Sequence, residues 1–148
     1  MSAMSDYLEN KLIDHIFRGV SFTAPAALHV ALFTAAPSDS GGGTEVSTSG
    51  TNYSRAALSP STTNWASTGG ATTTTNPSAG TGGATSNNSA ITFGAPSASW
   101  GTITHFGIFD ASTSGNLLVH GALTTSKTVN NGDPAPSFAI SALVVTLA

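Results

Sequence analysis

The sequence contains no cysteine, and only 7% of its residues carry a charge. Without cysteine, neither a disulfide nor a thiolate metal site can form. The four basic residues are outnumbered by seven acidic residues, which argues against nucleic-acid binding, because phosphate neutralisation requires a cluster of Lys and Arg. No apolar run approaches the roughly 18 residues that span a bilayer, so we expect no membrane contact.

The length and the apolar content are those of one ordinary domain. The chain has 148 residues, of which 39% are hydrophobic, enough for a single core of moderate size. We therefore expect residues 1–148 to form one domain. Since charges are so few, hydroxyl and amide groups must keep the surface soluble. A surface with so few ions is typical of a protein that packs densely against other proteins.

Residues 6–18 are the one good helix candidate. Leu8, Leu12 and Ile16 recur at a spacing of four, which places them along one side of a helix. Ser5 is a suitable N-cap, and Gly19 is suited to ending the helix. An isolated helix of this length is marginal in water, so we expect it to dock on another surface.

The rest of the chain predicts strands. The alternation over residues 28–33 is typical of a strand with both faces partly covered. Further strands are predicted at residues 53–58, 90–93, 102–109, 116–123, 137–140 and 143–147, separated by turn-forming segments. No crossover helices alternate with these strands, which excludes a parallel α/β fold. The predicted fold is mainly β, an antiparallel sandwich or a jelly-roll-like barrel with one N-terminal helix.

Residues 66–89 consist almost entirely of Ser, Thr, Gly, Asn and Ala. Such a segment buries too little apolar area to offset the entropy lost on ordering. Two interpretations stay open: a free linker or loop, and an extended arm that becomes ordered on a neighbouring subunit. Trp65 and Trp100 flank the segment and are candidates to fix its ends.

The sequence gives no sign of catalysis, and we predict no catalytic, cofactor-binding or metal-binding residue. No Gly-x-Ser-x-Gly elbow and no helical pair of metal-ligating His residues is present. A hairpin can bring His105 and His120 opposite each other without catalytic meaning, and hydrogen bonding to partners is the favoured role for these side chains. Asp110 and Asp133 are predicted turn residues. Arg55 is expected to pair with Glu45, with Asp39 or with a carboxylate of a partner, or else to be solvated.

A further signal lies in six segments of the sequence: residues 7–15, 17–19, 28–46, 52–55, 100–110 and 115–118. Together these segments resemble a family of small phage and prophage proteins that are commonly labelled tail fibre proteins. The resemblance implies a structural protein of the virion. Because the N-terminus carries no cationic region followed by an apolar run, we expect the protein to be made in the host cytoplasm. Ordinary fibres are long and carry repeats or heptads, which this chain lacks, so the first hypothesis is a capsid cement or decoration protein. The alternative is a tail or tail-fibre component, and the third hypothesis is a carbohydrate-binding module.

A structural role of this kind works through apolar contacts and strand addition between proteins. We expect homo-oligomers and contacts with the major capsid protein or with tail proteins. The predicted contact residues are Leu8, Leu12, Ile16, Arg55, Trp65, Trp100, Phe106 and Phe109. For the large apolar members of this set, burial in the core is the competing interpretation.

Overall fold

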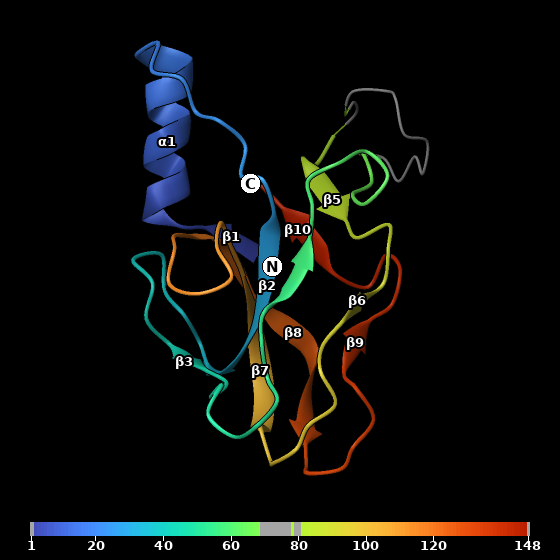
Figure 1. Ribbon diagram of the computed structural model, residues 1–148. Coiled ribbons are helices and arrows are strands. Elements are labelled where there is room, and N and C mark those ends of the chain that lie inside the picture. The colour runs from blue at the N-terminus through green and yellow to red at the C-terminus, as the bar shows by residue number, and fades with distance from the viewer. Residues whose placement is uncertain (1, 69–77, 79–80, 148) are drawn as a thin grey trace.

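The computed structural model describes residues 2–68, 78 and 81–147, and it shows a mainly β protein with one helix (Figure 1). In chain order the elements are β1 (Ser2–Met4), α1 (Asp6–Phe17), β2 (Leu28–Ala35), β3 (Thr44–Glu45), β4 (Ala56–Leu58), β5 (Ala84–Ser86), β6 (Ile91–Thr92), β7 (Gly101–Phe109), β8 (Leu117–Val129), β9 (Ser137–Phe138) and β10 (Val144–Thr146).

The main sheet has six strands and is antiparallel throughout. Its order is β1-β8-β7-β2-β3. Strand β4 also pairs with β2, on the same edge as β3 but at the other end of the strand. Two small antiparallel sheets, β5 with β10 and β6 with β9, complete the body. The predicted antiparallel sandwich with an N-terminal helix is confirmed. The sheets are open and do not close into a barrel.

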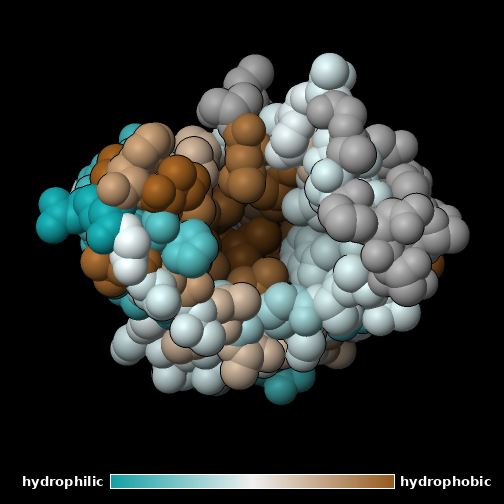
Figure 2. Space-filling model, turned by 90° about the horizontal axis from the view of Figure 1, so that it is seen from above, coloured by the Kyte–Doolittle hydropathy of each residue, from teal (hydrophilic) through white to brown (hydrophobic). Residues whose placement is uncertain are grey.

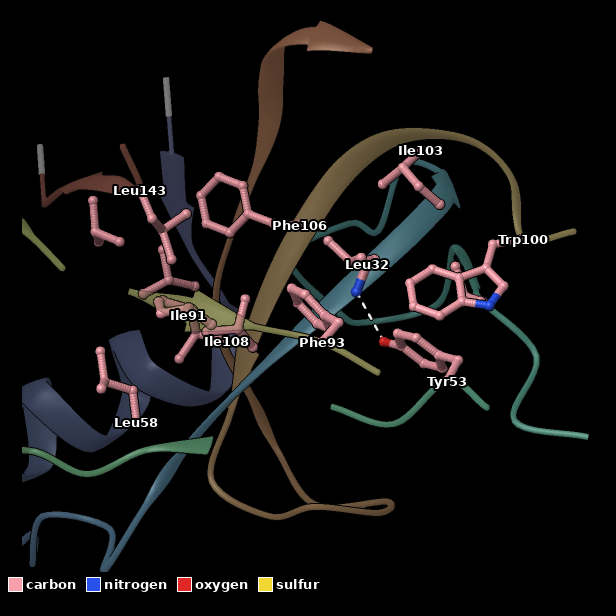
Figure 3. Packing of buried hydrophobic residues seen from close by; sticks show 14 of the residues in the cluster. Leu32, Tyr53, Leu58, Ile91, Phe93, Trp100, Ile103, Phe106, Ile108 and Leu143 are labelled. Carbon is pink, nitrogen blue, oxygen red and sulfur yellow. Dashed lines mark hydrogen bonds between the residues drawn. The ribbon is translucent and has the colours of Figure 1, made fainter. Parts of the chain in front are cut away.

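The core lies between the main sheet and the small sheets. Figure 3 shows Leu143, Ile91 and Phe93, from the side of the small sheets, packed toward Phe106 and other residues of the main sheet. Phe106 lies opposite Gly121 in the register of β7 and β8, and a Cβ on Gly121 would come within 3.0 Å of its ring. The glycine therefore gives the aromatic ring room to lie over the neighbouring strand.

The other face of the main sheet carries a second, smaller apolar group. The rings of Phe33 and Phe109 stack with their centroids 6.3 Å apart. Gly107 lies beneath them, since a Cβ there would be 3.0 Å from both Phe33 and Leu117. Both faces of β2 and β7 are thus covered, as the alternation of residues 28–33 predicts.

The segment 66–89 is in part a piece of this fold. Residues 84–86 form β5 and pair with β10, and Trp65 and Asn87 form an isolated bridge. Asn87 is fully buried, and its amide donates to the carbonyls of Ser89 (2.9 Å) and Ala139 (2.8 Å). At these positions the interpretation as an arm ordered only on a neighbour is wrong, because the partner strand belongs to the same chain. Residues 69–77 and 79–80 lie outside the described residues.

Candidate functional site

Helix α1 is held firmly at its N-terminal end. Ser5, the predicted cap, is buried, and its hydroxyl accepts a hydrogen bond from the N–H of Leu8 (3.3 Å). The same hydroxyl donates to the carbonyl of Leu117, and the N–H of Ser5 donates to the carbonyl of Leu118 (2.9 Å). The cap therefore joins the start of the helix to β8 as well as beginning the helix.

A second attachment runs through the loop that follows β2. The N–H of Asp6 donates to the carbonyl of Asp39 (3.0 Å), and the Asp39 carboxylate lies 3.0 Å from Nε2 of His120 on β8. Tyr7 and Leu8 pack against the core next to these contacts. The first turn of α1 is thus fixed by backbone, side-chain and apolar contacts together.

The outward side of α1 is apolar toward its C-terminal end. The exposed fractions are 50% for Ile13, 65% for Ile16, 79% for Phe17 and 50% for Val20, which follows the helix. We call these four residues the apolar stripe. The spacing of Ile13, Ile16 and Phe17 places these three on one side of the helix, and Val20 follows Gly19 beyond the helix end. Figure 2, viewed from above, shows apolar atoms on the helix and a hollow beside it that is also lined with apolar atoms.

The C-terminal end of α1 is also ordered. The carbonyl of Asp14 accepts hydrogen bonds from the N–H groups of Arg18 (3.1 Å) and Val20 (3.0 Å), and Gly19 turns the chain with φ of 69°. The returning segment is tied to the helix because the N–H of Phe22 donates to Nδ1 of His15 (3.2 Å). The apolar stripe therefore lies at a helix end that is fixed by hydrogen bonds.

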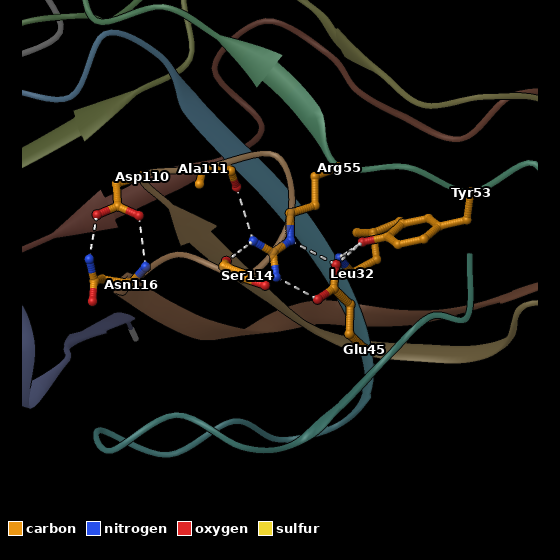
Figure 4. Close-up of polar contacts among 8 residues, drawn as sticks. All are labelled: Leu32, Glu45, Tyr53, Arg55, Asp110, Ala111, Ser114 and Asn116. Carbon is orange, nitrogen blue, oxygen red and sulfur yellow. Dashed lines mark hydrogen bonds and ion pairs between the residues drawn. The ribbon is translucent and has the colours of Figure 1, made fainter. Parts of the chain in front are cut away.

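A largely buried ion pair joins β3, the segment before β4 and the loop between β7 and β8 (Figure 4). Arg55 donates from Nε and Nη2 to the two carboxylate oxygens of Glu45, at 2.9 and 2.8 Å. Its Nη1 donates to the carbonyls of Ala111 (3.0 Å) and Ser114 (2.8 Å) in the loop between β7 and β8. The guanidinium carbon lies 3.6 Å above the centre of the Phe109 ring. Of the pairings considered from the sequence, Arg55 takes the one with Glu45.

Tyr53 extends this cluster into the core. Its hydroxyl donates to Glu45 (3.0 Å) and accepts from the N–H of Leu32 (2.9 Å). Burial raises the pKa of Tyr53 well above its ordinary range, and the neighbouring Glu45 carboxylate raises it further. The phenol therefore stays protonated, and it serves as a hydrogen-bonding link between the ion pair and β2.

A groove with a volume of about 800 Å³ runs between β8 and the segment 133–146. Its floor includes Leu32, Phe93 and Phe106, and Lys127 and Asp133 lie at its sides. Beyond Gly121 no other described strand pairs with the outer edge of β8. This edge is interrupted by a bulge at residues 123–126 and carries a lysine, features that protect an edge from strand addition.

The two histidines do not face each other, and this prediction is wrong. His105 is opposite Ala122 in the register, and His120 is opposite Gly107. The register shifts between Ile108, which is opposite Val119, and Phe109, which is opposite Leu117, so one extra residue of β8 between the turn and the histidines moves the pairing away from that of a simple hairpin. Within the described part of the chain, no three His, Asp or Glu side chains gather as a metal site would require. No helix there is long and apolar enough to cross a membrane.

The predicted contact residues fall into three groups. Trp100 and Phe106 are 4% and 5% exposed and belong to the core, so for these two the core-packing interpretation holds. The residues Leu8, Leu12, Arg55, Trp65 and Phe109 are partly buried. Ile16 alone of the set is well exposed.

The apolar stripe adds Ile13, Phe17 and Val20, which were not among the predicted contact residues. The i, i+3, i+4 spacing of Ile13, Ile16 and Phe17 was the available signal for the two helix residues among them.

The chain matches a family model described as podophage GP4 fiber I protein gp80 over residues 3–146. The chain belongs to this family. Among curated proteins, none matches it. As a member of a phage fibre-protein family, the protein is a structural component of the virion. The resemblance to phage tail fibre proteins is thereby confirmed.

Proposed function

We propose that the protein is a non-enzymatic building block of a phage fibre, in which the β-sandwich is a rigid body and α1 makes contacts with neighbouring proteins of the virion. The observation that carries this proposal is the contrast between the two ends of α1. Its first turn is joined to β8 and to the loop after β2, whereas its last turns present the apolar stripe. A fixed base with an exposed apolar end suits a contact element.

The family description supports the fibre alternative better than the capsid cement role that the sequence placed first. A short chain without heptads is compatible with a fibre, because a fibre can be assembled from several short chains. The glycan-binding hypothesis relied on exposed rings at Trp65 and Trp100. Trp100 is buried, with its indole N–H donating to the carbonyl of Thr51 (2.9 Å), so it offers no stacking face.

Labelling of intact particles tests the proposal. Antibodies against the purified protein, made visible with gold in electron micrographs, are expected to mark fibres at the tail. Removal of the gene should give particles that retain filled capsids but lack those fibres. Gold distributed over the whole shell would instead support the cement role and refute the fibre assignment.

A copy-number measurement is an independent check. Quantitative mass spectrometry of purified particles should give a small number of copies relative to the major capsid protein. A ratio near one copy per capsid subunit, or per small group of subunits, would contradict a fibre.

A further inference from the structure

A pocket distinct from the groove beside β8 lies on the face of the main sheet that is turned away from the core. Its volume is about 410 Å³, within the range of about 300–1,000 Å³ that is typical of small-molecule sites. The second apolar group, with Phe33, Phe109 and Leu117, forms its floor. Its walls come from the first turn of α1, the loop between β2 and β3, and the loop between β7 and β8, which lie side by side in Figure 1. The apolar stripe contributes no residue to this pocket.

The walls of the pocket are rich in hydrogen-bond acceptors. The Asp39 carboxylate lies with Oδ1 3.0 Å from Nε2 of His120, and its Oδ2 makes no hydrogen bond with a described residue. Glu45 accepts three hydrogen bonds, which leaves lone-pair capacity on Oε2. Among the residues that line the pocket Arg55 is the only cation, and four of its five N–H donors are already used by Glu45 and two loop carbonyls (Figure 4). A ligand must therefore supply hydrogen-bond donors, and an anion would meet two carboxylates.

Four glycines line the same pocket: Gly41, Gly42, Gly43 and Gly115. All four have a positive φ, between 73° and 95°, a conformation that glycine adopts without steric cost. A Cβ on Gly41 or Gly42 would meet no atom within 4 Å, so the space beside this loop is open. A ligand can therefore approach the backbone closely at these positions.

We propose that this pocket binds a neutral monosaccharide unit of a glycan. A pyranose ring has an apolar face of C–H groups and an edge of hydroxyl groups. The C–H face suits the apolar floor, and the hydroxyl groups donate to Asp39, to Glu45 and to carbonyls of the glycine-rich loop. Sugars that carry a carboxylate or a phosphate are disfavoured by the two acidic side chains. The site goes beyond the fibre assignment, and it contains neither Trp65 nor Trp100.

The distribution of charge favours a neutral ligand over an organic cation. Arg55 pairs with both carboxylate oxygens of Glu45 and covers the ring of Phe109 at 3.6 Å. The aromatic face that would attract an ammonium group is thus already taken by a guanidinium. An ammonium ligand is left with Asp39, whose side chain is 60% exposed, and ion pairs at such exposed positions contribute little.

Saturation-transfer difference NMR with the full chain tests the ligand class. The probes are the methyl glycosides of glucose, galactose, mannose, rhamnose and N-acetylglucosamine. At least one of them is expected to bind with a Kd of roughly 1–10 mM, as a ligand of so few atoms should. The methyl glycoside of glucuronic acid is the anionic control and butylamine the cationic control, and neither should bind in this range. Failure of every neutral glycoside to bind would overturn the proposal, and so would equal binding of the glucuronide or binding of butylamine alone.

A blocking substitution tests the location of the site. Ser40 lines the pocket and is exposed, and its hydroxyl lies 3.2 Å from that of the exposed Ser38. Ser40→Trp places a large side chain at the pocket and is expected to raise the Kd of the bound glycoside about tenfold or more. Ser59→Trp is the matched control, because Ser59 is an exposed serine outside the pocket, and its Kd should equal that of the wild type. An unchanged Kd in Ser40→Trp would place the binding elsewhere and overturn the proposal.

Asp39→Asn tests the role of the acceptor and decides the matter if Ser40→Trp does not fold. The amide keeps the shape of the side chain but removes its charge, so the Kd of the neutral glycoside should rise about threefold or more. The same change removes one of the two carboxylates that repel an anion, so the glucuronide should bind better than it does to the wild type. Circular dichroism checks that the variant is folded. A folded Asp39→Asn protein with unchanged affinity for both sugars would overturn the proposal.

Discussion

Replacement of Glu45 by alanine should destabilise the fold strongly. The carboxylate accepts two hydrogen bonds from Arg55 and one from Tyr53, and the Arg55 side chain is only 8% exposed. Water therefore cannot replace the lost partner. Removal of one member of a buried ion pair typically costs 3–5 kcal/mol. Glu45 is 26% exposed and Arg55 keeps two backbone carbonyls, so we expect the lower end, about 3 kcal/mol.

Urea unfolding followed by tryptophan fluorescence measures this loss, because Trp100 is buried with its ring centre 5.2 Å from that of Tyr53. A loss of this size lowers the melting temperature by roughly 6–12 °C in a domain of this length. Asp14→Ala is the control: it removes the exposed ion pair with Arg18 and should cost at most about 0.5 kcal/mol. Equal losses in the two variants would refute the argument that burial makes the Glu45–Arg55 pair important.

Three further changes test other parts of the structure by the same unfolding assay. Tyr53→Phe leaves the N–H of Leu32 without its partner and should cost about 1–3 kcal/mol near neutral pH. Because the folded-state pKa of Tyr53 is raised, the wild type should lose this advantage as the pH rises above about 10, where the unfolded tyrosine ionises; a constant difference up to pH 11 would contradict the assignment. Asn87→Ala removes three hydrogen bonds, including one from the N–H of Leu143 (2.8 Å), and should cost about 2–4 kcal/mol; a loss below about 1 kcal/mol would show that β5 is not anchored there. Gly107→Ala places a methyl group 3.0 Å from Phe33 and should cost about 1–3 kcal/mol, and an unchanged midpoint would show that the rings can move aside.

Local patterns in the sequence predicted the long elements well. The cap at Ser5, the apolar repeat and Gly19 located α1 to within one residue. Alternation located β2 and β7, and it located the start of β8. These signals are short-range, so they can be recognised without knowing which elements pack against each other. The short strands β1, β3 and β5 were missed, whereas the short strands β4, β6, β9 and β10 lie within predicted strand segments.

Exposure could not be predicted in the same way, because it depends on residues distant in the chain. Leu8, Leu12 and Ile16 form one row in the sequence, yet Leu8 packs against the core and Ile16 is 65% exposed. The row drifts around the helix by about 40° with each step of four residues, since four residues turn through more than one full turn. Contacts at Ser5 and Asp6 set which side meets the body, and these involve residues 39, 117 and 118. Burial of Trp100 and Phe106 likewise depends on strand register.

The positions of the few charged residues explain how a low charge content can favour assembly. Several charged side chains make contacts within the chain. Glu45 and Arg55 pair with each other, and Asp39 contacts His120. Asp110 accepts hydrogen bonds from the backbone N–H and the side-chain amide of Asn116, both at 2.7 Å. Few ions are left to be desolvated when the surface meets another protein, and ion desolvation is a major cost of association. An assembly of such bodies therefore needs few compensating charges on its neighbours, and a modest apolar contact such as the stripe can decide which surfaces meet.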